Sequence, residues 1–171
     1  RPVNVAGIED AVDVVAGDRF SCAALATGGV KCWGADNRGQ LGDGEGESAG
    51  IVDVAGIEDA VAVTAGAFGR SAHACALLGS GGVKCWGTNL EGQLGSGALS
   101  STEFVPVDVV DLTDAVEISA GAQHTCALTR SGEVQCWGSN RNGRLGDGGE
   151  EDSLTPVTVA GLTEAIDVAV G

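Results

Sequence analysis

Hydrophobic and polar residues alternate in short runs along the whole chain, and glycine or acidic residues separate these runs. The clearest runs are AVDVVAG (11–17), AVAVTAG (60–66), AVEISAG (115–121) and AIDVAVG (165–171). Short alternating runs rich in β-branched residues and bounded by turn residues predict β-strands. In the first unit we place four strands, A to D, at about 11–16, 20–26, 30–35 and 51–55.

The sequence repeats about every 50 residues. The stretch GVKCWGADNRGQLGDG (29–44) returns as GVKCWGTNLEGQLGSG (82–97) and as EVQCWGSNRNGRLGDG (133–148). Four short antiparallel strands in a period of this length are typical of a β-propeller blade. We therefore predict an all-β chain that forms a single β-propeller segment over residues 1–171. Its complete blades lie at about 11–55, 60–110 and 115–160, and single strands are left over at 2–5 and 165–170.

The repeat also carries a family resemblance. The pattern G-x-x-H-T-C-A-L followed by G-x-V-x-C-W-G-x-N-x-x-G-Q-L-G-D-G resembles the regulator of chromosome condensation repeat, in the cysteine-containing form found in exported bacterial proteins. The departures are Asp36 for Asn, Arg144 for Gln, Phe20 for His, Ser96 for Asp and an insertion around AFGRS (67–71). The resemblance implies a ring of seven blades. Because three blades cannot close a ring, we expect a segment of a larger propeller, with self-association of two half-rings as the alternative.

Six cysteines fall in three pairs, and the members of each pair are ten residues apart. Zinc knuckles use a much shorter C-x2–4-C spacing. Each pair brackets a glycine-containing turn, and directly opposed residues of an antiparallel pair can have Cα atoms about 4.5 to 5.5 Å apart, within disulfide range. We predict disulfides within the blades, and three pairs of buried thiols are the alternative. Disulfides would indicate an oxidising compartment, hence an extracellular or cell-surface location. The predicted pairs are Cys22 with Cys32, Cys75 with Cys85, and Cys126 with Cys136.

Other repeated residues are predicted to build the blades. A tryptophan follows the second cysteine of each unit and would supply the apolar area that one blade buries against the next. His73 and His124 share their place in the repeat with Phe20. A position that accepts His or Phe is predicted to be structural, with a polar tip that satisfies a nearby backbone group. The predicted core tryptophans are Trp33, Trp86 and Trp137.

Composition argues against several classes of function. The formal net charge of −15 disfavours nucleic acid as a partner, because affinity for phosphates comes largely from Lys and Arg. No apolar run reaches the roughly 20 residues that span a bilayer, so we predict no membrane insertion. The chain has no H-E-x-x-H or Walker motif. We therefore expect a protein that is not an enzyme and uses no cofactor or metal. A carboxylate pair such as Glu150 and Asp152 is expected by chance among 24 acidic residues.

Residues that depart from the repeat mark the predicted binding site. Strand parity places the A–B and C–D loops on one face, and loops on a rigid scaffold are where binding residues concentrate. Arginine, exposed aromatic and amide side chains suit a protein interface. We therefore predict a protein partner. The resemblance offers two precedents, a nucleotide exchange factor for a small GTPase and a secreted inhibitor of β-lactamase; an exported inhibitor or adhesion module fits the cysteines better. The predicted binding residues are Arg19, Arg38, Phe68, Arg70, Leu90, Gln123 and Arg141, with Asn37, Glu91 and Asn142 beside them.

An alternative is calcium or carbohydrate binding through the acidic C–D loops. Oxygen-rich loops can hold Ca²⁺, although the chain has no D-x-[DN]-x-[DN]-G loop. The candidate ligands are Asp43, Glu45 and Glu47 in one loop, and Asp147, Glu150, Glu151 and Asp152 in another.

Overall fold

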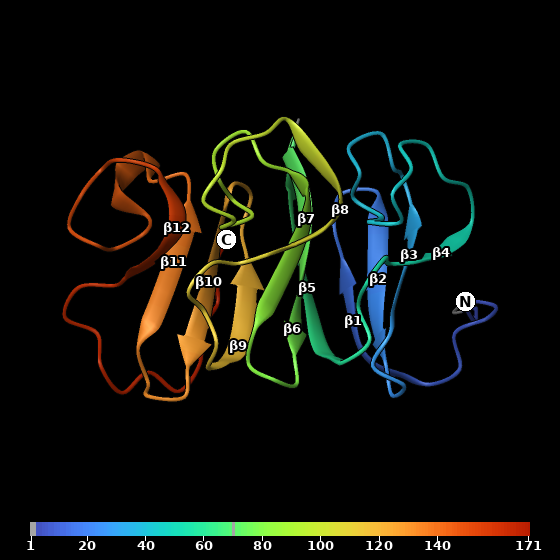
Figure 1. The fold of residues 1–171 in the computed structure, drawn as a ribbon, viewed down its shortest axis with the longest axis horizontal. Helices are drawn as coiled ribbons and strands as arrows, with labels where there is room; N and C mark the ends of the chain where they lie inside the picture. Colours follow the sequence, from blue (N-terminus) through green and yellow to red (C-terminus); the bar gives the residue numbers. More distant parts are fainter. Residues whose placement is uncertain (1–2, 70) are drawn as a thin grey trace.

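The protein forms three β-sheets that stand side by side. The computed structural model describes residues 3–69 and 71–171, and for residues 67 and 68 the backbone only. Each sheet has four antiparallel strands that are neighbours in the order of the sequence. Figure 1 shows the three sheets next to one another along the longest axis of the molecule. This is the architecture of three consecutive propeller blades, as the sequence predicts.

Each predicted blade contains one sheet. The first consists of β1 (Ala11–Ala16), β2 (Phe20–Leu25), β3 (Val30–Gly34) and β4 (Ile51–Asp53). The second consists of β5 (Ala60–Phe68), β6 (Ser71–Leu78), β7 (Val83–Thr88) and β8 (Thr102–Asp108). The third consists of β9 (Ala115–Ala120), β10 (His124–Thr129), β11 (Val134–Gly138) and β12 (Ser153–Thr158), and a short 3-10 helix spans Arg141–Gly143.

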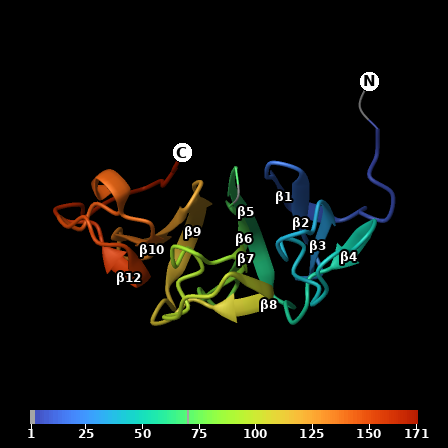
Figure 2. The same ribbon diagram turned by 90° about the horizontal axis from the view of Figure 1, so that it is seen from above.

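The first strands of the blades lie closest to one another. Figure 2 shows the sheets spreading as a fan, with β1, β5 and β9 toward its inner side. Side chains link these strands: the Val63 N–H donates to the Asp13 carboxylate at 2.9 Å, and the Ala120 N–H donates to the Thr64 hydroxyl at 3.0 Å.

The two leftover strands are a correction to the sequence-based prediction. Residues 3–5 and 165–170 form no strand in the structure. A strand needs the backbone ladder of a neighbouring strand, and no described segment supplies one along them. Residues 165–170 instead lie against the third sheet, where Ala165, Val168 and Val170 pack on its core and the Val170 N–H donates to the Ser119 hydroxyl at 3.1 Å.

The disulfide prediction is confirmed, and all six cysteines are paired. In each blade the register sets the two cysteines directly opposite each other on the second and third strands. Their Cα atoms are 4.1, 4.0 and 4.0 Å apart, close to the spacing of a non-hydrogen-bonded antiparallel pair. The disulfides join Cys22 to Cys32, Cys75 to Cys85 and Cys126 to Cys136, and all are buried.

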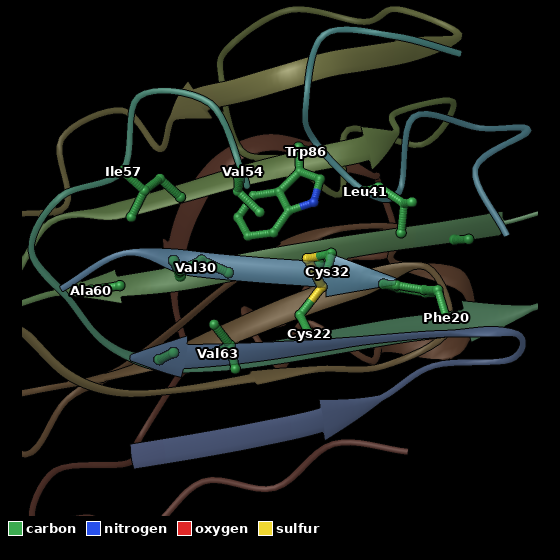
Figure 3. Close-up of a cluster of buried hydrophobic side chains, with 14 residues drawn as sticks. Phe20, Cys22, Val30, Cys32, Leu41, Val54, Ile57, Ala60, Val63 and Trp86 are labelled. Carbon is green, nitrogen blue, oxygen red and sulfur yellow. A yellow bond between two sulfur atoms is a disulfide. The ribbon is translucent and has the colours of Figure 1, made fainter. Parts of the chain in front are cut away.

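The tryptophan of one blade packs into the preceding blade. Trp86 is fully buried and joins the core of the first sheet with Leu41, Val54 and Ile57 (Figure 3). Its indole N–H donates to the backbone carbonyl of Gln40 at 3.0 Å. The next interface repeats this bond, because Trp137 donates to the carbonyl of Gln93 at 2.9 Å. Trp33 is only half-buried, and in the described part of the chain it joins none of the three buried cores.

Glycine in the Gly-Gln-Leu-Gly turn makes this packing possible. Gly42 and Gly95 have positive φ angles of 70° and 68°, which favour glycine. A Cβ atom at either position would lie 2.8 Å from the indole ring of the next blade. The turn therefore recurs in the repeat because the tryptophan of the following blade packs against it.

Candidate functional site

The long variable loops gather at one end of the three sheets. We call this end the loop face; it carries the β1–β2, β5–β6 and β9–β10 connections and the β3–β4, β7–β8 and β11–β12 loops. Because the strands alternate in direction, the short hairpins β2–β3, β6–β7 and β10–β11 lie at the opposite end. In Figure 1 the long loops lie along the upper edge of the molecule.

A repeated polar residue shapes each long loop from inside. The side-chain Oδ1 atoms of Asp36, Asn89 and Asn140 accept the N–H of the leucine five residues later, at 3.0, 3.1 and 2.9 Å. All three polar side chains are buried. In the first blade, the second oxygen of Asp36 also accepts the Ser48 N–H at 3.2 Å, and burial raises the pKa of Asp36. These repeated residues are therefore committed to the scaffold.

Several acidic side chains of the loops also accept hydrogen bonds from backbone N–H groups of the same loop. Asp43 accepts the N–H of Glu45 at 3.0 Å, and Asp152 accepts the N–H of Asn140 at 2.6 Å. The backbone N–H of Gly149 and the amide of Asn140 bond to Asp147 and lower its pKa.

The calcium alternative finds no assembled ligand set. Within residues 3–69 and 71–171, no three His, Cys, Asp or Glu side chains meet in a group that could hold a metal ion. In these loops, the carboxylates of Asp43, Asp147 and Asp152 accept hydrogen bonds from their own loop. The same loops carry the other candidates, Glu45, Glu47, Glu150 and Glu151.

His73 is buried at the interface between the second and third blades. Its Nε2 lies 2.9 Å from the Thr125 hydroxyl. That hydroxyl donates its proton to the Gln93 carbonyl at 3.1 Å, so Nε2–H is the donor of the first bond. The sequence-based expectation of a backbone partner is thus corrected, because a hydroxyl stands between His73 and the backbone. Burial is the larger cause and the charge of His124 the smaller one, and together they lower the pKa of His73 to about 3.

This burial predicts acid sensitivity. The unfolded chain binds a proton at His73 near pH 6.5, whereas the folded protein resists it until about pH 3, so stability is intact above pH 6.5 and falls as the pH is lowered. At about pH 4.5, two units below the unfolded pKa, we expect a loss of about 2 to 3 kcal/mol from this residue. Urea unfolding near pH 7 and pH 4.5 measures it.

The matched control is His73→Phe, which copies the residue that the first blade has at this place. Phe20 is buried there with 3% exposure. The variant should reduce the difference between the two pH values by about 2 to 3 kcal/mol, whatever its stability at pH 7, and leave the part that comes from His124, whose pKa burial also lowers. An unchanged difference would show that His73 is not the titrating group.

Two of the predicted binding residues, Arg19 and Arg38, line one pocket. Arg19, Leu90 and Arg141 are exposed, with Leu90 at 56%, and Arg38 and Gln123 are half-buried. Phe68 ends β5, but its side chain, like the whole of Arg70, lies outside the described residues. Leu90, Gln123 and Arg141 belong to later blades and do not line the pocket that Arg19 and Arg38 share.

Arg19 and Arg38 both line a pocket on the loop face, between the first and second blades. Its volume is about 150 Å³. The β1–β2 and β3–β4 loops form one side, and residues around the start of β6 form the other. Sequence reasoning missed Asp18, Gln40 and Ser71 as pocket residues, because no repeat pattern shows which loops meet across two blades. The lining residues are Asp18, Arg19, Phe20, Ala35, Asn37, Arg38, Gln40, Gly69, Ser71 and Ala72.

Comparison with known families agrees with this architecture. A family model described as the regulator of chromosome condensation (RCC1) repeat matches residues 11–40, 61–93 and 115–144. A second model of the same description matches residues 80–128 and 131–171. The chain belongs to the regulator of chromosome condensation repeat family. The resemblance seen in the sequence is thereby confirmed at family level.

Similar proteins are much longer than this chain. The human E3 ubiquitin-protein ligase HERC2 is 33% identical over 164 residues, which cover 94% of this chain and 3% of HERC2. The ultraviolet-B receptor UVR8 of Arabidopsis thaliana is 39% identical over 140 residues, which cover 78% of this chain and 31% of the receptor. The chain therefore spans less than a third of either relative.

Solved structures show the same fold. Human WBSCR16 superimposes with a TM-score of 0.80 at 27% identity, covering 96% of this chain and 43% of that protein. Prp20p of Saccharomyces cerevisiae superimposes with a TM-score of 0.72 at 18% identity, covering 90% of this chain and 39% of that protein. In the described part of the chain, no helix is long and apolar enough to span a membrane.

Proposed function

We propose that this chain is a non-enzymatic protein-binding module of an exported bacterial β-propeller protein, and that it binds its partner through the loop face. The observation that carries the proposal is that repeated residues and residues that depart from the repeat differ in burial. Repeated side chains such as Asn89, Asn140 and Trp86 are buried and bonded inside the scaffold, whereas departures from the repeat such as Leu90 and Arg141 are exposed on the loop face.

Known propellers of this fold support a binding role. Prp20p, the yeast RCC1, was solved bound to Kap60, and a second structure of it was described together with its binding to Gsp1p and histones. The family relatives also include a protein named as a receptor. The ligase name of HERC2 does not transfer, because this chain aligns with 3% of that protein.

Export is proposed from the cysteines. Disulfides persist in oxidising compartments and are rare in the cytosol. All six cysteines of this chain are paired within blades, which suits an extracellular or cell-surface location.

The test compares the two ends of the blades. A photoreactive amino acid at Leu90 on the loop face, or at Ser131 in the β10–β11 hairpin, is crosslinked to proteins of the culture medium and cell surface of the source organism. The protein captured from Leu90 is then purified, and its affinity is measured for three chains: unaltered, Leu90→Glu/Arg141→Glu, and Arg130→Glu.

We expect the double variant on the loop face to bind roughly tenfold or more weakly, because it places two carboxylates, one of them in place of an arginine, in the proposed interface. Arg130→Glu, an exposed charge reversal in the hairpin at the opposite end, should leave the affinity within about twofold. Equal affinities for all three chains, or capture from Ser131 alone, would refute binding through the loop face.

A further inference from the structure

The pocket between the first and second blades combines two arginines that the other blades lack. The residues equivalent to Arg19 are Ala72 and Gln123, and those equivalent to Arg38 are Glu91 and Asn142. Both arginines of the first blade line the pocket. Because the fold is built without them in the other two blades, this pair is not needed to form a blade.

Internal carboxylates do not neutralise these arginines. The ion pairs of the described residues are Lys31 with Asp53 and Lys84 with Asp108, which use both lysines of the chain. Asp18 also lines the pocket, but it forms no ion pair with either arginine there. Two guanidinium groups against one carboxylate leave the pocket a net positive charge in a chain whose net charge is −15.

The backbone that carries the arginines is fixed. The Arg38 N–H donates to the Gln40 side chain at 2.8 Å, and the amide of Gln40 donates to Asn37 at 3.3 Å. The Arg19 carbonyl accepts the N–H of Ala35 at 2.8 Å, which ties the β1–β2 connection to the β3–β4 loop. Binding to such a preorganised pocket loses little backbone entropy.

We propose that this pocket binds the carboxylate of a Glu or Asp side chain that projects from the partner protein. The planar donors of arginine match a carboxylate and can bind it through two parallel hydrogen bonds. A volume of about 150 Å³ is enough for a group the size of benzene, whereas pockets for drug-sized ligands start at about 300 Å³. The pocket thus has the size and charge for one acidic side chain. This inference rests on the proposed protein-binding function and specifies the chemistry of its anchor.

The test uses two small probes that differ only in charge. N-acetyl-glutamate N-methylamide and N-acetyl-glutamine N-methylamide are titrated into the ¹⁵N-labelled chain at constant ionic strength, and backbone and arginine Nε–H resonances are followed by NMR. The expected result is saturable shifts at the residues that line the pocket with the glutamate probe and none with the glutamine probe.

The variants Arg19→Gln/Arg38→Gln, Asp18→Asn and Arg130→Gln complete the design. The double variant should weaken glutamate binding by roughly tenfold or more, because it removes the charge-assisted hydrogen bonds to the carboxylate. Asp18→Asn should strengthen it by removing the competing charge. Arg130→Gln, the same charge change in a hairpin at the opposite end, should have no effect.

The inference is overturned if both probes shift the same residues equally, if no saturable shift occurs at the pocket, or if the double variant binds glutamate unchanged. Any of these results, with a captured partner still sensitive to Leu90→Glu/Arg141→Glu, would leave protein binding through the loop face intact. Saturable glutamate binding with a partner unaffected by Arg19→Gln/Arg38→Gln would also overturn it, since the carboxylate would then come from a free small molecule.

Discussion

Trp86→Ala should lower the free energy of unfolding by about 3 to 5 kcal/mol, the cost of removing a large buried aromatic side chain. The indole lies between two blades with no exposed surface, so its loss opens a cavity against Leu41 and Val54. It also leaves the Gln40 carbonyl without its donor. Urea unfolding followed by far-UV circular dichroism measures the change.

Trp33→Ala is the matched control at the same place in the repeat. Trp33 is only half-buried and belongs to none of the buried cores of the described residues. Its replacement should therefore cost clearly less than that of Trp86. Equal costs, or an unfolding curve unaltered by Trp86→Ala, would contradict the proposed role of the tryptophan as a contact between blades.

Reduction of the three disulfides should destabilise the chain even more. Each joins two cysteines that are ten residues apart in sequence, and the chain-entropy estimate gives about 3 kcal/mol for closing a loop of this size. The sum for three disulfides, roughly 9 kcal/mol, is comparable to the whole stability of a typical domain, about 5 to 15 kcal/mol. We expect the reduced chain to be largely unfolded at low urea concentration.

Intact mass after alkylation makes the comparison quantitative. The chain as isolated should take up no alkyl group, and the reduced chain should take up six. The variant Cys75→Ala/Cys85→Ala should lose about a third of the total effect, since the other two disulfides remain. Six reactive thiols before reduction, or identical unfolding curves with and without reductant, would show that disulfides do not stabilise the blades.

Much of the fold could be predicted because each blade is encoded locally. Strand alternation, the spacing of ten between cysteines and the 51- and 53-residue spacing of the tryptophans all reflect contacts within one repeat or the repeat itself. The strand limits agree closely: the predicted 20–26 and 30–35 became Phe20–Leu25 and Val30–Gly34. The prediction failed at residues 3–5 and 165–170, where strand-like sequence lacks a neighbouring strand with which to form a ladder.

Contacts between blades could not be predicted in the same way. Nothing in the sequence indicates that Trp86 bonds to the Gln40 carbonyl, or that His73 reaches the Thr125 hydroxyl, since these pairs lie about one repeat apart. The pocket between the first and second blades could not be predicted for the same reason. Arg19 and Arg38 could be picked out singly as departures from the repeat, but only the blade arrangement brings them to one pocket with Ser71.

Hydrogen exchange of the chain with and without its captured partner tests the central claim, protein binding through the loop face, most directly. The account predicts slower exchange on binding in the β1–β2 connection and in the long loops at 35–50 and 89–101, and unchanged exchange in the hairpins at 26–29, 79–82 and 130–133. Protection confined to those hairpins, or spread evenly over both ends of the sheets, would contradict it.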